Sequence, residues 1–326
     1  MNAGSIMERL SAFVKRVFKT SLEVFLEALR YSPNAQGYVA GSITELLLKR
    51  HLDSLGYETL RIREKWEGKK QHHGDFYFRK RDSESGWYIV EAKGVKSNSE
   101  KWHKLYNRDK LISFLYMHAD KIRWLDHHEN TKEAAIEAWI QRELPEFYGR
   151  YSEPLYDYEE VKNYTPPRNQ RETPKSRAIQ NLKRLSREEI NERIEERIQY
   201  LNSKLRVLET HFVASAGSGG REIATPRKDE FHIVAVDIFL KYYEHYFLFA
   251  NPRNLEGAEG YPDHLQQNYV IGFVFVENGV ENLHCSEDWK SNFEDIATTL
   301  SGADAVKESE MQVDYRYMKE ADNDAD

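Results

Sequence analysis

The stretch GDFYFRKRDSESGWYIVEAKG, residues 74–94, decides the fold because it predicts a β-hairpin with charged side chains at one end. Its two halves, DFYFRKR and WYIVEAKG, are rich in aromatic and β-branched residues and flank a polar turn at 82–86. Side chains two apart share a face of a strand, so Glu91 and Lys93 point the same way. Antiparallel pairing around the turn places the start of the first strand, at Asp75, beside the end of the second.

Two carboxylates and an ammonium group at one strand end point to metal chemistry. Neighbouring carboxylates repel and raise the pKa of one of them, and a divalent cation removes that conflict. Mg²⁺ is a hard ion that takes one or two carboxylates together with water and substrate phosphate oxygens. It lowers the pKa of a bound water, and a lysine beside it can orient that water and stabilise extra negative charge. We therefore expect Asp75, Glu91 and Lys93 to form a magnesium-dependent catalytic centre.

These residues resemble the signature of the PD-(D/E)XK nuclease superfamily, to which most type II restriction endonucleases belong. In that pattern an Asp opens one hairpin strand and (D/E)-X-K lies on the next, here Asp75 and the E-A-K that ends in Lys93. The family often adds a Glu from the preceding helix, and the run GSITELLLKRHLDSLGYE, residues 41–58, puts Glu45 in that place. The resemblance implies that Asp75, Glu91 and Glu45 bind metal and that Lys93 acts on the attacking water.

The resemblance covers residues 36–125 and has one departure, since Gly74 stands where the family pattern has proline. A structural alternative also stays open. The charged trio can be a salt-bridged strand end with a turn residue, and Glu45 can be an ordinary glutamate on a helix surface. An α/β protein with no nucleic-acid role predicts that Asp75 and Glu91 end far apart in the fold.

The remaining patterns predict an α/β fold, a restriction-endonuclease-like mixed β-sheet flanked by helices, with further helices and strands for DNA recognition. Apolar residues recur at helical spacing near the N-terminus, and Gly56 stands where a helix would end. The expected helices span 5–30, 36–55, 100–124, 131–143 and 186–208, and the expected strands span 57–63, 75–81, 87–94, 232–241, 246–250 and 269–277.

The organisation along the chain is predicted in three parts. Residues 1–145 hold the N-terminal helices and the catalytic core. Residues 146–303 connect to, and extend, the sheet within what we expect to be the same compact domain. Residues 304–326 form an acidic C-terminal tail. The 326 residues, 40% of them hydrophobic, can bury a large core.

Several classes of protein are disfavoured. No run approaches the length of a membrane span, and the N-terminus reads as an amphipathic helix and not as a signal peptide. The single cysteine, Cys285, excludes an internal disulfide and fits a cytoplasmic location. The glycine-rich loop after residue 214 lacks the G-K-[ST] of a phosphate-binding P-loop, so no nucleotide cofactor is expected.

The net charge of −7 hides an uneven distribution. The segment 304–326 carries −5, from eight acidic and three basic residues, and leaves −2 for the rest of the chain. The segment 168–187 has seven basic residues and one acidic residue. A localised basic surface matters more for DNA binding than the total charge, although such a run can also be a solvated helix face.

Basic residues near the hairpin and in two later segments are candidates for DNA contacts. Lys104 and Arg108 are four apart on the predicted helix after the hairpin, so they would share a face and could follow a phosphate backbone. The same residues can be an ordinary solvated face. The full set of expected DNA-binding residues is Lys101, Lys104, Arg108, Arg168, Arg171, Arg221, Arg227 and Lys228.

The combined prediction is a Mg²⁺-dependent endonuclease that cuts double-stranded DNA, of the type II restriction enzyme kind. Symmetric cutting of both strands implies a homodimer by analogy. Three alternatives remain: a repair, recombination or modification-dependent nuclease with the same core, a DNA-binding protein with a vestigial nuclease site, and an α/β protein without a nucleic-acid role.

Overall fold

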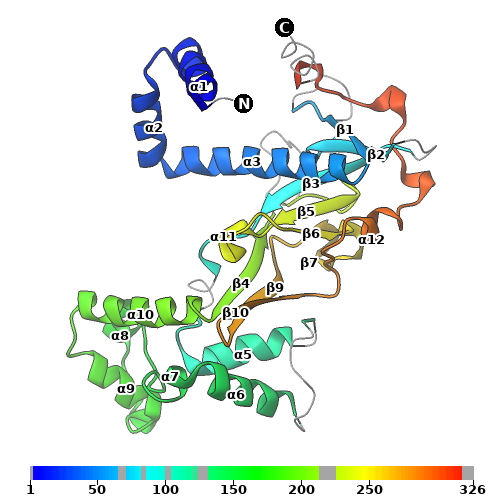
Figure 1. Cartoon of the computed structure of the whole chain (residues 1–326). Helices are drawn as coiled ribbons and strands as arrows, with labels where there is room; N and C mark the ends of the chain where they lie inside the picture. Colours follow the sequence, from blue (N-terminus) through cyan, green and yellow to red (C-terminus); the bar gives the residue numbers. More distant parts are fainter. Residues whose placement is uncertain are drawn as a thin grey trace.

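The computed structural model describes residues 3–64, 71–81, 86–99, 104–119, 121–122, 131–212 and 225–317. Within these ranges the chain is a mixed α/β structure built on two larger β-sheets and a small two-stranded one (Figure 1). The predicted mixed sheet with helices packed against it is confirmed. No helix in the described ranges is long and apolar enough to cross a bilayer.

The central sheet has five strands in the order β1-β2-β3-β5-β6. β3 and β5 are parallel and the other neighbours are antiparallel. α3 lies along one face, where Leu48 and Leu52 pack in one buried cluster with Phe76 and Val90 (Figure 1). The elements are α3 Pro33–Ser54, β1 Tyr57–Arg61, β2 Phe76–Lys80, β3 Tyr88–Gly94, β5 Ile233–Asp237 and β6 Phe247–Ala250.

The predicted hairpin is β2 and β3. The two strands pair antiparallel, with Phe76 opposite Val90 and Phe78 opposite Tyr88. Gly56, with a φ of +82°, follows α3 in the left-handed conformation that favours glycine after a helix, as the sequence predicts. The described residues of the stretch 74–94 therefore have the local structure expected from their alternating pattern.

The second sheet has three strands in the order β10-β9-β4 and covers the other face of the central sheet. Ile271 and Val274 of β9 join the buried cluster of Ile89 and Val234 from the central sheet. Its own outer face packs against helices through Phe273. The elements are β4 Leu205–His211, β9 Asn268–Glu277, β10 Val280–Cys285, α5 Arg108–His118, α6 Lys132–Glu143 and α7 Pro145–Tyr148.

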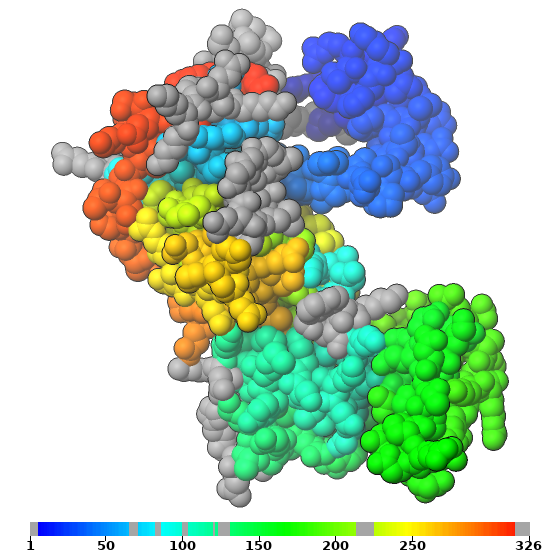
Figure 2. Space-filling view, turned by 180° about the vertical axis from the view of Figure 1, so that it is seen from behind, coloured from blue at the N-terminus to red at the C-terminus, as the bar shows by residue number. Residues whose placement is uncertain are grey.

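Three further helices extend this second layer into a lobe. They pack on one another through Val161, Ile179 and Ile190. Figure 2 shows a hollow between this lobe, in green, and the N-terminal helices, in blue. The carboxyl end of β3 and the adjoining α11 point to the side on which both project (Figure 1). The elements are α8 Tyr158–Asn163, α9 Pro174–Leu182, α10 Arg187–Asn202 and α11 Phe239–Tyr242.

Three predicted helices and one predicted strand are wrong in their extent. The helix expected over 100–124 is α5 Arg108–His118, and the strand expected over 232–241 is β5, which ends at Asp237 before α11. The helix expected over 186–208 begins as predicted, with a capping box between Ser186 and Glu189, but ends at Asn202. Residues 205–211 form β4 because they pair with β9, a contact that local periodicity does not reveal. The helix expected over 5–30 is two helices, α1 Ala3–Phe18 and α2 Leu22–Tyr31. The break has Lys19 at a φ of 56° and Ser21 as the N-cap of α2.

The acid-rich end of the chain packs on the central sheet as far as it is described. Val306 forms a β-bridge with Trp87, and Val313 forms one with Ile62. The backbone N–H of Asp314 donates to the carbonyl of Arg61 at 2.9 Å. The segment around residues 312–314 therefore pairs beside the end of β1, at Arg61 and the two residues that follow it. The remaining elements are β7 Gly257–Ala258, β8 Tyr261–Leu265 and α12 Glu294–Ala297.

Candidate active site

One edge of the central sheet collects the charged ends of four strands. β2 runs antiparallel to β1 and to β3, and β5 runs parallel to β3. The carboxyl ends of β1, β3 and β5 therefore meet the amino end of β2. Arg61 ends β1, Asp75 precedes β2, Lys93 lies near the end of β3 and Asp237 ends β5.

Asp75 is tied to the strand that carries Glu91 and Lys93. Its backbone N–H donates to the carbonyl of Val90 at 3.0 Å. Its carboxylate oxygen Oδ2 accepts a hydrogen bond of 2.7 Å from the backbone N–H of Ala92. Oδ1 has no hydrogen-bond partner among the described residues, so it stays open to a ligand.

Gly74 explains the departure from the family pattern. Its φ is +115°, a conformation that side-chain-bearing residues rarely adopt and that proline cannot adopt. A Cβ atom at this position would lie 2.4 Å from Cγ2 of Ile89 and 3.3 Å from the carbonyl oxygen of Val90. Glycine is therefore required for the chain to enter β2 close against β3, which is what brings Asp75 to the E-A-K segment.

Glu91 and Lys93 share a face of β3, as strand periodicity predicts. Val90 and Ala92, which alternate with them along the strand, point to the opposite face and pack in the buried cluster under α3. Glu91 and Lys93 form an ion pair, and their side chains are 14% and 26% exposed. The pair is thus shielded from bulk water but still reachable by a ligand.

The charges of the carboxylates and of Lys93 shift one another's pKa values. Burial raises the pKa of the Asp75 carboxyl well above its usual value, and the charges of Glu91 and Glu45 raise it further. Burial acts to lower the pKa of Lys93, but nearby carboxylates, Glu91 foremost, outweigh burial and the pKa is raised. Lys93 is therefore protonated at neutral pH, and its positive charge offsets the negative charges of the nearby carboxylates.

Glu45 lies on α3 and is held by a partner that the sequence did not point out. Its Oε2 is 2.5 Å from a guanidinium nitrogen of Arg61, the last residue of β1. Both side chains are about one-fifth exposed. Arg61 also lies over the ring of Phe76, 5.7 Å from its centroid. The predicted role of Glu45 as a metal ligand remains a prediction, and in this arrangement Arg61 already neutralises its charge.

The donor set fits a hard divalent cation with open coordination positions. Within the described ranges, no three His, Cys, Asp or Glu side chains converge closely enough to form a metal cage. Mg²⁺ does not need one, because it commonly binds one or two carboxylates and completes its shell with water and substrate phosphate. Asp75 Oδ1 and the Glu91 carboxylate are hard oxygen donors at the strand end, and burial, together with the charges of Glu91 and Glu45, raises the pKa of Asp75.

Asp237 is a second buried carboxylate at this edge that sequence reasoning missed. It is fully buried, accepts a 3.0 Å hydrogen bond from Thr44 Oγ1, and lies 2.6 Å from Nδ1 of His245. Its other oxygen accepts from the backbone N–H of Phe239 at 3.1 Å. Thr44 precedes Glu45 on α3, so Asp237 fixes α3 against the sheet at the candidate site. No local pattern predicts this contact, which joins residues 193 positions apart.

The basic residues next to the hairpin are not arranged as expected. Lys104 lies before α5, with a φ of 52°, so it shares no helix face with Arg108. Lys104 is paired with Asp157 at 2.8 Å, and Arg108 forms an ion pair with Glu137. The predicted shared helix face is wrong, because the backbone turns at Lys104 and carboxylates of other elements neutralise both cations. Lys101 lies outside the described residues.

The other predicted DNA contacts are scattered. Arg168 and Arg171 are exposed in the lobe, between α8 and α9. Arg227 pairs with Asp229, and Lys228 donates to the carbonyl of Leu255 at 2.5 Å. Both residues lie beside β8, because Arg227 forms a β-bridge with residue 264 and the backbone N–H of Lys228 donates to the carbonyl of residue 263. Arg221 lies outside the described residues. The structure thus brings together the four predicted catalytic residues but not the predicted DNA contacts.

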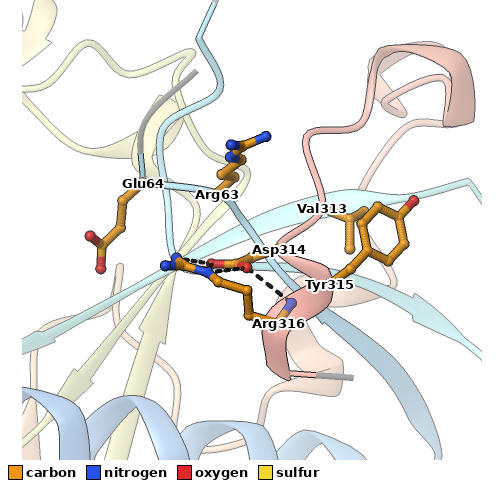
Figure 3. A pocket seen from close by; sticks show the side chains of 6 residues that line it. All are labelled: Arg63, Glu64, Val313, Asp314, Tyr315 and Arg316. Atoms are coloured by element: carbon orange, nitrogen blue, oxygen red, sulfur yellow. Dashed lines mark hydrogen bonds and ion pairs between the residues drawn. The ribbon is translucent and has the colours of Figure 1, made fainter. Parts of the chain in front are cut away.

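A cavity of about 550 Å³ lies beside the candidate site. Figure 3 shows its walls, where the guanidinium of Arg316 is bonded to Asp314. The cavity neighbours Arg61, the partner of Glu45, because the N–H of Asp314 in its wall donates to the carbonyl of Arg61 at 2.9 Å. The lining residues are Arg63, Glu64, Val313, Asp314, Tyr315 and Arg316.

Comparison of the chain with protein-family models, curated proteins and solved structures gives no match in any of the three.

Proposed function

We propose that the chain is a Mg²⁺-dependent deoxyribonuclease that hydrolyses phosphodiester bonds in double-stranded DNA, of the type II restriction endonuclease kind. The observation that carries the proposal is the bond between Asp75 and the backbone N–H of Ala92, which holds Asp75 against the E-A-K segment. The geometry supports the resemblance, because the three charged residues converge at one strand end and influence one another's charge.

Asp75 and Glu91 are the residues that would hold the metal, with Glu45 able to support a second ion. When bound, Mg²⁺ supplies positive charge that lowers the pKa of a coordinated water and offsets charge developing on the phosphorus. Arg61 limits the role of Glu45, since Glu45 must leave its ion pair with Arg61 to bind an ion directly.

Lys93 supplies a positively charged hydrogen-bond donor. Its raised pKa makes it an ammonium at neutral pH, so it orients the attacking water and stabilises negative charge on the phosphate oxygens. Lys93 is paired with Glu91, so its ammonium would be available to the substrate if the Glu91 carboxylate were engaged by a metal ion.

The placement of the site supports a large, extended substrate. The carboxyl end of β3 points toward the hollow between the N-terminal helices and the lobe (Figures 1 and 2). Arg168 and Arg171 are exposed on the lobe, in a segment with seven basic residues, and are candidates to contact a DNA duplex. A second copy of the chain would act on the second strand.

The test is cleavage of plasmid DNA by the purified chain with and without Mg²⁺. We expect cleavage that EDTA abolishes, and a loss of about 100-fold or more in Asp75→Asn and Lys93→Ala. Lys80→Ala is the matched control, because Lys80 lies on the same hairpin at the other end of β2 and pairs with Glu294. Equal cleavage by Lys93→Ala and wild type would refute the site assignment.

The products distinguish the kinds of nuclease. Discrete fragments with a shared end sequence indicate a restriction-type enzyme. Cleavage only of methylated or branched DNA indicates a modification-dependent or repair enzyme. Binding of duplex DNA without any cleavage, with Mg²⁺ or Mn²⁺, indicates a vestigial site.

A further inference from the structure

Another ionisable side chain, that of His245, lies at the same edge of the central sheet as the candidate site. His245 follows α11 and precedes β6, and its Nδ1 atom lies 2.6 Å from Oδ2 of Asp237, the last residue of β5. The Asp237 side chain is fully buried, whereas the side chain of His245 is 38% exposed. The imidazole is therefore held by a group inside the protein and can still be reached by a substrate.

The contacts of Asp237 determine which nitrogen of His245 is available. The Asp237 carboxylate accepts hydrogen bonds from Thr44 Oγ1 at 3.0 Å and from the backbone N–H of Phe239 at 3.1 Å. It likewise accepts from the imidazole, so Nδ1 of His245 carries a hydrogen. The ring of Phe239 packs against the imidazole, with 4.7 Å between the centroids. Nε2 has no hydrogen-bond partner among the described residues, so it is the nitrogen open to a substrate.

The pair of His245 and Asp237 is next to the predicted catalytic residues. Asp237 is the partner of Gly94 in the parallel pairing of β5 with β3, and Gly94 directly follows Lys93. Neighbouring strands lie about 4.8 Å apart, so Asp237 is one strand spacing from the end of the E-A-K segment. On the other side, Asp237 binds the residue that directly precedes Glu45 on α3. The sheet and α3 therefore both bring the pair to the candidate site.

The segment that carries His245 is fixed to the chain that leaves β3. Lys241 on α11 is 5% exposed, and its Nζ donates to the carbonyl of Ser97 at 3.1 Å. The backbone N–H of Ile238 donates to the carbonyl of Tyr246 at 3.0 Å and closes the loop around His245. These bonds, together with the one to Asp237, set the position of the imidazole relative to the end of β3.

Asp237 and Lys93 lie on opposite faces of the central sheet. Lys93 shares its face with Glu91, away from α3, whereas Asp237 contacts α3 and holds His245. In phosphoryl transfer the attacking and the leaving oxygen lie roughly in line, on opposite sides of the phosphorus. A phosphate at the strand end with its attacking water beside Lys93 would therefore have its leaving oxygen on the side of His245.

We propose that His245 is the general acid of the candidate site and protonates the leaving sugar oxygen, an inference that rests on the proposed nuclease function. As the attacking water forms its bond to phosphorus, the bond from phosphorus to the leaving sugar oxygen breaks, and that oxygen takes the proton from Nε2. The water releases its own proton to solvent, and Nε2 regains a proton from solvent after the products leave. Histidine is the side chain that most often fills this role. Asp237 is a positioning residue that orients the ring through Nδ1.

The experiment compares His245→Asn with the wild type on two DNA duplexes of the same sequence. One is unmodified, and the other has sulfur in place of the leaving oxygen at the bond that the wild type cleaves. The asparagine amide can donate to Asp237, so the variant keeps the buried bond but has no proton to give. With Mn²⁺ and saturating enzyme we expect the single-turnover rate on the unmodified duplex to fall about 100-fold or more. On the sulfur duplex we expect the wild-type rate, because a thiolate leaves without a proton.

The control variant is His211→Asn, at an exposed histidine bonded to Asn268, and it should cleave both duplexes as the wild type does. DNA affinity, measured with Ca²⁺ in place of Mn²⁺, should be equal for His245→Asn and the wild type. Circular dichroism and the urea midpoint verify that each variant is folded.

Three results would overturn the assignment of His245: wild-type cleavage of the unmodified duplex by His245→Asn, a loss of the same size on both duplexes, or a loss explained by weaker DNA binding. A merely structural role of the ring predicts the second result, and a binding contact with phosphate predicts the third. A wild-type chain that cleaves neither duplex would refute the proposed function itself, and the inference with it.

Discussion

The carboxylate of Asp75 accepts a 2.7 Å hydrogen bond from the backbone N–H of Ala92, the residue between Glu91 and Lys93. This single bond crosses from the entry of β2 to the end of β3. It fixes the position of one carboxylate relative to two other charged groups without using their side chains. The site therefore depends on the backbone geometry of the hairpin, and its properties can be tested apart from activity.

Metal binding should stabilise the fold through Asp75. Burial and the neighbouring carboxylates raise the pKa of Asp75, so a bound cation relieves repulsion that exists only in the native state. A ligand at about 100 times its Kd raises the free energy of unfolding by about 2.7 kcal/mol. We expect Mg²⁺ or Mn²⁺ to raise the thermal midpoint of the wild type but not that of Asp75→Asn.

Asp53→Asn is the matched control for this measurement, because Asp53 lies in the last turn of α3, where it pairs with Lys49 at 2.6 Å and accepts a hydrogen bond from Thr59, and it contacts none of the described residues of the candidate site. Its midpoint should respond to the metal as the wild type does. An identical metal response in the Asp75 and Asp53 variants would show that the cation binds elsewhere.

Gly74→Ala should destabilise the protein and the site together. The φ of +115° and the 2.4 Å approach to Ile89 force the backbone or Ile89 to move. We expect a loss of about 1–3 kcal/mol in the free energy of unfolding, measured with urea. Gly41→Ala on α3 is the control, since a Cβ there meets nothing within 4 Å and alanine favours a helix. A Gly74 variant as stable as the Gly41 variant would contradict the strained entry into β2.

Asp237→Asn should loosen α3 from the sheet. The substitution removes the charge that His245 and Thr44 share, at a position that is fully buried. We expect a loss of about 1–3 kcal/mol in unfolding free energy and reduced cleavage, because Glu45 follows Thr44 on α3. Thr44→Val removes one hydrogen bond and should cost about 1 kcal/mol. If Asp237→Asn keeps both wild-type stability and wild-type cleavage, the carboxylate is not an anchor of α3.

His118 should make the fold sensitive to mild acid. Burial lowers the pKa of His118 to about 4 from 6.5, and its Nδ1 lacks a hydrogen-bond partner in the described part of the chain. Above pH 6.5 both states are neutral. As the pH falls from 6.5 to 4, the unfolded chain takes a proton that the native state resists, so stability is lost. Below pH 4 both states are protonated and the loss stops.

A pKa shift of one unit corresponds to about 1.4 kcal/mol in the free energy of unfolding. Because the His118 ring is partly exposed, solvent screening reduces the total loss to about 1–2 kcal/mol. Urea denaturation at a series of pH values measures it. His118→Phe should flatten the stability profile between pH 6.5 and 4, because the ring packs against Phe114 and keeps an apolar neighbour. His211→Gln, an exposed position, should leave the profile unchanged.

The hairpin and its charged end could be predicted from the sequence because both depend on local alternation. Glu91 and Lys93 share a face by strand periodicity, and the short turn sets the pairing that brings Asp75 beside them. The roles of Arg61 and Asp237 could not be predicted in this way. Both residues contact side chains of α3, Arg61 through Glu45 and Asp237 through Thr44. The sequence pattern of a strand end does not indicate whether a helix side chain contacts it.

The same limit explains the errors in extent. Residues 205–208 continue the helical pattern of the preceding helix, and only their pairing with β9 makes them a strand. The local pattern predicts that Lys104 lies on a helix face. In the structure Lys104 pairs with Asp157 of the lobe, and the sequence around Lys104 does not indicate this contact. In each of these cases the deciding partner is far away in the chain.

The segment that pairs beside the end of β1 has a consequence for biosynthesis. Ile62 and Val313, which form a β-bridge, are 251 positions apart. During translation the β2–β3 hairpin is therefore made long before the segment that pairs beside the end of β1. Until residues 312–314 have been made, the end of β1 keeps unpaired backbone groups of the kind that recruit other strands. Truncated chains that lack these residues would keep this open edge.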